Sequence, residues 1–163
     1  MFTLFSLKNS TEMTPEEAAP FLRYLECYAS QKEGAWLSEL PEWRKFRLFW
    51  CHAMTLENGV LGAFSPFFPR KIFLIKDPNP DTLEFWHENM TDIVIHELRH
   101  AWQFQKYGWV YFLCAIPGIR QLTLERDASR ITEFAEKFFR DLAAEEAARR
   151  FEESQAKFMK RQG

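Results

Sequence analysis

The feature that most constrains the fold is a long segment, residues 122–162, that contains neither proline nor glycine. Within it, apolar residues recur at alternating spacings of four and three, at Leu124, Ala128, Ile131, Ala135, Phe138 and Leu142. This spacing places them on one face of an α-helix, and such a face is normally buried against another apolar surface. Beyond Glu145 the apolar residues thin out among many charges. The sequence therefore predicts a long helix that is docked along its first half and continues as a charged tail.

Helix-capping and turn-forming residues divide the N-terminal part of the chain. Thr14, Pro15 and Glu17 form the pattern of a capping box with proline at the first helical position, which predicts a helix over residues 14–30. A proline followed by glutamate and regularly spaced aromatic residues predicts a second helix over 41–56. We expect the aromatic side chains of both helices to lie in the core.

The middle of the chain changes from turn-forming residues to a strand pattern and then to a helical one. Glycine and prolines mark residues 62–69 as an irregular connector. Residues 71–76 form a short apolar run bounded by turn formers, which predicts a strand. A helical pattern then covers 81–107, and Gly108 is a typical helix stop. Whether this helix is interrupted near Thr91 is left open.

Charge and cysteine content exclude several classes of protein. The formal net charge is −2 with both signs interspersed, which argues against a nucleic-acid surface. Cys27, Cys51 and Cys114 are odd in number and lack C-x-x-C spacing, so a reducing compartment is expected rather than a disulfide framework. Residues 1–10 do not resemble a signal peptide, and the apolar run 109–116 is too short to span a membrane. These features predict a cytoplasmic protein, with a virion or secretion apparatus as the other setting.

The most specific chemical pattern is His96-Glu97-Leu98-Arg99-His100, which reads H-E-x-x-H on the helix predicted over 81–107. Residues four apart lie on one face of a helix, one turn apart, so both imidazoles can reach one ion. The glutamate beside the first histidine can then take a proton from water held at that ion. The alternative is a buried pair of structural histidines.

A catalytic zinc site needs a third protein ligand and leaves the fourth position to water. Glu125 and Asp127, early on the long helix, are the two candidates if residues 108–121 form a crossover between two packed helices. On one helix these acids point about 200° apart, so both cannot face the ion. We favour Glu125, because apolar residues would flank it on the packed side, and Asp127 would then be a solvent-facing charge at the helix start. The predicted ligands are therefore His96, His100 and Glu125.

This arrangement resembles the zincin metallopeptidases, and in particular their gluzincin branch, over about residues 72–131. Those proteins place H-E-x-x-H on one helix and a glutamate in an E-x-x-A or E-x-x-S setting on the next, as Glu125 is placed here. The resemblance implies a Zn²⁺ cofactor held by His96, His100 and Glu125. It also implies that Glu97 is the general base in hydrolysis of a protein or peptide.

Neighbouring residues extend this resemblance and depart from it. Gln103 extends the motif to H-E-x-x-H-x-x-Q, which is similar to small zincin-like domains associated with bacterial toxins and injection systems. It would line the cleft, or it is a solvated glutamine. Thermolysin-like enzymes carry a histidine-orienting aspartate where this chain has Ser129, and Asp92, one turn before His96, is the candidate substitute. The resemblance also implies that the strand at 72–75 pairs with an extended peptide.

The fold expected from these patterns is α+β and mainly α-helical. It is a minimal zincin-like domain with a short strand or sheet beside the H-E-x-x-H helix and a long C-terminal helix. We expect one domain over residues 1–163, in which 1–65 form an N-terminal helical cover. Residues 66–142 would form the metal-site core, and residues 143–163 an extended helical tail.

Three functions remain open at this point. The first is a zinc-dependent peptidase, for which His87, Tyr107 and Tyr111 are the candidates to stabilise the oxyanion. The second is a catalytically weak or inactive zincin-like structural or binding module, for example in a phage particle or secretion apparatus. The third is a helical interaction protein without metal, in which Phe151 and Phe158 of the tail bind a partner helix.

Overall fold

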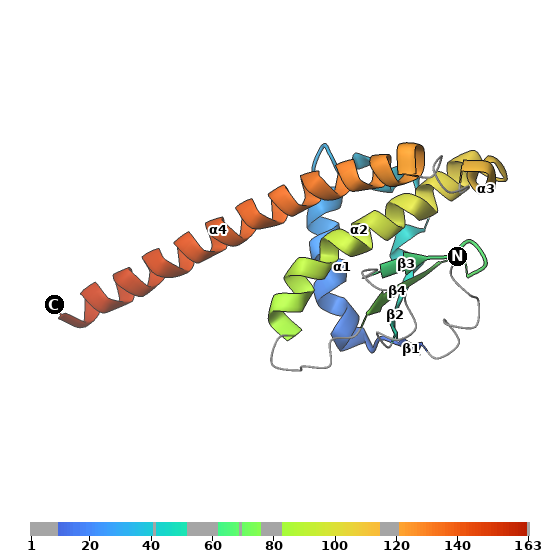
Figure 1. Ribbon diagram of the computed structural model, residues 1–163. Coiled ribbons are helices and arrows are strands. Elements are labelled where there is room, and N and C mark those ends of the chain that lie inside the picture. Colours follow the sequence, from blue (N-terminus) through green and yellow to red (C-terminus); the bar gives the residue numbers. More distant parts are fainter. Residues whose placement is uncertain are drawn as a thin grey trace.

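The computed structural model describes residues 10–40, 42–51, 62–68, 70–75, 83–114 and 121–162 (Figure 1). Its α-helices are α1 (Pro15–Ala29), α2 (Leu83–Tyr107), α3 (Val110–Cys114) and α4 (Arg126–Gln162). Short 3₁₀ helices cover Ala35–Glu39 and Trp43–Lys45, and a π-helical turn covers Gln121–Glu125. The strands are β1 (Thr11–Glu12), β2 (Arg47–Cys51), β3 (Gly62–Phe64) and β4 (Lys71–Ile75). The fold is therefore α+β and mainly helical, as predicted.

The four strands form one sheet in the order β1-β2-β4-β3. β2 and β4 are parallel, whereas β1 and β3 pair antiparallel with their neighbours. β4 confirms the strand predicted over 71–76. The expectation that this strand aligns a peptide is wrong, because β2 and β3 already occupy both of its edges. Among the described strands, β3 is the edge beside α2.

The helix predicted over 41–56 is wrong in its described part. A 3₁₀ helix at Trp43–Lys45 is followed by β2, and Phe49 and Trp50 of that strand are buried. The aromatic spacing fits a helix, but Phe49 and Trp50 pair with β1 on one side and with β4 on the other. Tertiary pairing of this kind routinely overrides local propensity. Residues 52–56 lie outside the described segments. The connector expected over 62–69 is also partly wrong, since it begins with β3.

α2 runs without a break through Thr91 and packs against α1, α4, β3 and β4. It ends at Tyr107, and Gly108 adopts the left-handed conformation (φ 56°) that favours glycine at a helix end. Figure 1 shows α4 returning antiparallel along α2, with α2 between α4 and the sheet. The predicted crossover between two packed helices is confirmed.

The two remaining predicted helices are also confirmed. Thr14 caps α1 through a capping box with Glu17. On α4 the predicted stripe faces the core, where Ala128 and Ala135 are fully buried and the other members are buried or half-buried. The aromatic core includes Phe21, Tyr28, Trp36, Trp43, Trp50 and Phe139. The second half of α4 extends away from the other elements, and its described side chains beyond Glu146 are exposed.

Candidate metal centre

The two histidines of the H-E-x-x-H motif face α4 from one side of α2. His96 and His100 are one helical turn apart, and their ring centroids are separated by 4.8 Å. Their Nε2 atoms approach within 3.2 Å of each other. His100 is buried and His96 is half-buried, so this pair lies at the edge of the core rather than on an open surface. The geometry agrees with the helical spacing from which the site was predicted.

Glu125 joins the two histidines from the next helix. It is the last residue of the π-helical turn that leads into α4. Its Oε2 lies 3.2 Å from His96 Nε2 and 3.4 Å from His100 Nε2. In the described part of the chain, these three side chains form the group of histidine, cysteine or acidic residues that could hold a metal ion. The structure therefore brings together the three predicted ligands.

The separations of the three ligand atoms fit a tetrahedral zinc ion. Bonds of 2.0–2.1 Å at tetrahedral angles place neighbouring ligand atoms about 3.3–3.4 Å apart. The observed separations of the His96, His100 and Glu125 ligand atoms are 3.2, 3.2 and 3.4 Å. Two imidazoles and a carboxylate are also the donor set of a catalytic zinc site with one position left for water.

The outer nitrogens of both histidines are held so that their inner nitrogens can bind a metal. His100 Nδ1 lies 2.9 Å from the side-chain oxygen of Gln103, which can only accept. His96 Nδ1 lies 3.1 Å from the Thr132 hydroxyl, and that hydroxyl donates its own hydrogen to the carbonyl of Ala128. Each Nδ1 therefore carries a proton, so each Nε2 faces Glu125 and can bind a metal when it has no proton of its own. A metal ion at that point would replace the proton that His100 shares with the Glu125 carboxylate.

Gln103 neither lines a cleft nor lies in solvent. It is 1% exposed, and its amide nitrogen donates to the carbonyl of Leu124 at 3.0 Å and to Asp127 at 2.8 Å. Asp127 also accepts two hydrogen bonds from Arg99, at 2.7 and 3.1 Å. Although burial opposes it, these partners lower the pKa of Asp127. This network fixes His100 and joins α2 to α4 on both sides of the candidate ligand Glu125.

Asp127 is therefore neither a ligand nor the solvent-facing charge that was expected as its alternative role. It is half-buried and paired with Arg99, whose guanidinium lies 3.8 Å from the Trp102 ring centroid. That stacking holds Arg99 on the side of α2 away from the histidine pair, as helical geometry predicts. Thermolysin-like enzymes have a histidine-orienting aspartate at the position of Ser129. Here Asp127 provides the negative charge, and it acts on His100 through Gln103.

Glu97 lies beside the candidate ligands, with its carboxylate at β3, an edge strand of the described sheet. It is 8% exposed, and its Oε2 accepts a hydrogen bond of 2.7 Å from the backbone N–H of Phe64 in β3. Burial raises the pKa of Glu97, although the two histidines and the Phe64 N–H oppose the rise. Burial alone would lower the pKa of His100, but the hydrogen bond to Glu125 and the charge of Glu97 leave it raised.

Gly62 allows this close approach of β3 to α2. A Cβ at this position would lie 2.5 Å from Ile93 Cγ2 and 3.3 Å from Glu97 Cγ. A side chain here would push the edge strand away from Glu97. The sequence suggested only a connector at this glycine, because the approach depends on two elements that are distant along the chain.

Asp92 does not take the histidine-orienting role proposed for it. Thr132 holds that position at His96, and Asp92 instead lines a cavity of about 390 Å³ together with Tyr24, Glu136 and Phe139. Burial raises the pKa of Asp92 from 3.8 to about 6, and the charge of Glu136 adds to the rise. The sequence feature that could have indicated Thr132 as the partner of His96 is its position seven residues after Glu125, on the same face of one helix.

Replacing Asp92 with asparagine should stabilise the protein at neutral pH by about 1 kcal/mol, a figure reduced for partial exposure to solvent. The folded pKa of about 6 exceeds the ordinary 3.8, so the ionised carboxylate disfavours folding above pH 6. This penalty disappears as pH falls from about 6 to about 4. Urea denaturation at both ends of this range should show the gain only at the higher pH. Asp141→Asn, at an exposed site on α4, is the control and should show no gain at either pH.

The candidates for stabilising an oxyanion are not supported by their contacts. Tyr111 is buried against Phe104 and Phe112, and the Tyr107 ring packs on Trp102. The rings of both tyrosines therefore pack against other aromatic residues rather than against the candidate ligands. The side chain of His87 lies outside the described part of the structure.

Comparison with models of protein families, with curated proteins and with solved structures finds no match to this chain. In the described residues, no helix is both long enough and apolar enough to cross a membrane.

Proposed function

We propose that this protein is a zinc-dependent peptidase that hydrolyses a protein or peptide substrate. The observation that supports it best is the triangle of ligand atoms from His96, His100 and Glu125, 3.2 to 3.4 Å on a side. The buried carboxylate of Glu97 lies next to this triangle. The proposal extends the zincin resemblance of the sequence to the geometry of the site.

The roles of the residues follow from their positions. His96, His100 and Glu125 would hold the ion, while Gln103 and Thr132 orient the two imidazoles. When bound, zinc supplies a Lewis-acid centre that acidifies water and polarises a carbonyl group. Glu97 would accept a proton from the attacking water at its carboxylate and pass it to the leaving amine. Burial raises the pKa of Glu97, which is the direction that strengthens a carboxylate as a proton acceptor.

The edge of the sheet supports a peptide as the substrate class. Among the described strands β3 is at an edge of the sheet, and the N–H of Phe64 on its outer side is hydrogen-bonded to Glu97. An extended peptide can add to an open strand edge through main-chain hydrogen bonds. A peptide bound along β3 would lie beside both Glu97 and the metal ligands.

Metal analysis and a cleavage assay on purified protein test this proposal. We expect one zinc per chain, loss of that zinc in the His96→Ala/His100→Ala variant, and peptide cleavage that chelation removes and zinc restores. Wild-type protein without zinc under zinc-replete conditions would refute the proposed metal site.

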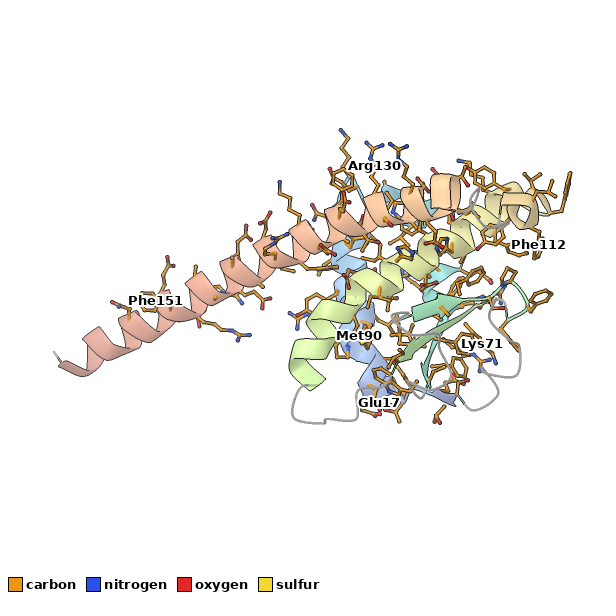
Figure 2. All side chains as sticks on the ribbon, in the orientation of Figure 1. Glu17, Lys71, Met90, Phe112, Arg130 and Phe151 are labelled. Atoms are coloured by element: carbon orange, nitrogen blue, oxygen red, sulfur yellow. The ribbon has the colours of Figure 1, made fainter. Side chains whose placement is uncertain are left out.

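A metal-holding binding module is the second candidate function, and the tail of α4 favours it. The helix continues well beyond the rest of the described structure, where Phe151 is 63% exposed (Figure 2). Such a tail can present a surface to a partner helix. Zinc binding without any zinc-dependent cleavage of a broad peptide library would favour this module over the peptidase.

A further inference from the structure

An apolar surface at the α3 end of the molecule has no role in the metal centre. We call it the apolar tip, and it consists of Phe67, Tyr107, Trp109, Val110, Phe112 and Leu113. Their exposed fractions range from 38% for Val110 to 72% for Trp109. In Figure 2, Phe112 lies at this end and Phe151 at the opposite end, on the tail of α4. Large apolar side chains gathered at one exposed point normally mark an interaction surface.

The apolar tip is held in place by packing against α2 and the β3–β4 connection. Gly108 ends α2 with a positive φ angle, so that α3 begins directly after the turn. Tyr111 of α3 is 7% exposed and packs edge-on against Phe104 of α2. The ring of Phe112 contacts Phe67 of the β3–β4 connection. The exposed side chains therefore project from a packed base.

Lysine side chains flank the apolar tip, and one acidic residue, Glu39, lies beside Lys106 and Trp102. Residues 107–119 contain no aspartate, glutamate, lysine, arginine or histidine, and Lys106 and Arg120 bracket them. Lys71 lies over the rings of Phe49 and Phe68, and Phe68 directly follows Phe67 of the tip in the chain. In the described structure, Lys106 likewise lies over an aromatic ring, that of Trp102. An uncharged apolar centre with a cationic border complements a surface that is apolar inside and anionic outside.

We propose that the apolar tip docks on an anionic lipid membrane. Tryptophan and tyrosine favour the boundary between headgroups and acyl chains, and nearby lysine and arginine are attracted to anionic lipids. α3 is only five residues long, which is too short to cross a bilayer, so it would lie within this boundary. Trp109 and Tyr107 are the tip residues whose side chains combine an apolar ring with a hydrogen-bonding group, which suits them to this boundary.

Docking would bring the candidate metal centre close to the membrane. His100 lies seven residues before the end of α2, which corresponds to about 10 Å along the helix. The tip itself contains none of the proposed ligands. Lipid binding therefore does not depend on the proposed peptidase function, and each proposal can fail without the other.

Co-sedimentation with vesicles tests the docking. We expect wild-type protein to bind vesicles of phosphatidylcholine mixed with phosphatidylglycerol, and to bind phosphatidylcholine alone more weakly. Trp109→Ser/Leu113→Ser should lower the partition coefficient about tenfold or more, because two anchors are lost. Phe151→Ser removes an equally exposed phenylalanine from the α4 tail and should bind like wild type. Circular dichroism should show all three proteins folded.

Three results would overturn the proposal. One is wild-type protein that stays in solution with both kinds of vesicle. Another is the Trp109/Leu113 double variant sedimenting as well as wild type. The third is an oligomer of wild-type protein that the double variant abolishes without any vesicle binding, which would assign the apolar tip to contacts between copies of this chain.

Discussion

Peptide cleavage should fall by roughly 10²- to 10⁴-fold when Glu97 is replaced by glutamine, which is the contribution of a general base. Glutamine has the size of glutamate and keeps an oxygen that can accept the Phe64 N–H, so the fold and the edge of β3 should be retained. It cannot take a proton from water at neutral pH. Zinc content should stay at the wild-type level, since Glu97 is not one of the three proposed ligands.

Cleavage rates and zinc content measured on the same preparations decide this prediction. Glu133→Gln, at an exposed position on α4, is the matched control and should cleave like wild type. Equal cleavage by wild type and Glu97→Gln would remove Glu97 from the mechanism. Loss of zinc in Glu97→Gln would instead show that this carboxylate holds the metal.

The second large effect is expected for zinc affinity. Glu125→Ala should weaken zinc binding by more than the roughly 10- to 100-fold that follows when an outer partner of a ligand is lost. Asp127→Ala should fall within that smaller range, because Asp127 acts through Gln103 and His100. The difference arises because, among the described side chains, it is Glu125 that places an oxygen within 3.2 to 3.4 Å of both imidazole nitrogens.

Competition with a chromogenic chelator would rank the two variants. Gln103→Leu should resemble Asp127→Ala, because both changes release the same histidine. Gln105→Leu, at an exposed position on the same helix, is the control and should bind zinc like wild type. A larger loss for Asp127→Ala than for Glu125→Ala would contradict the ligand assignment.

The sequence predicted the helices better than the sheet, and the reason is physical. α2 and α4 follow from spacings of three and four residues along a continuous segment. β2 depends on hydrogen bonds to β1 and β4, and its Phe49 and Trp50 also fit a helical spacing. β3 is three residues long, so its pattern is too short to indicate a strand.

The same distinction applies to the candidate site: residues that form a pattern within one helix could be predicted, and contacts between helices could not. His96, Glu97 and His100 form a local pattern on one helix, and Glu125 could be proposed once α2 and α4 were expected to pack side by side. The roles of Thr132 and Gln103 depend on which atoms face each other across that contact. Spacing within a single helix contains no such information, and Asp92 was therefore assigned a position that Thr132 occupies.

The π-helical turn at Gln121–Glu125 makes the third ligand depend on helical register. Glu125 is the last residue of this turn and leads directly into α4, so deleting one residue between Glu125 and Thr132 would rotate Glu125 by about 100° relative to Thr132 and the rest of α4. Extra residues before Gln121 would leave that register unchanged. Chains that share this centre should therefore vary in length before Gln121 and keep a constant length from Glu125 to Thr132.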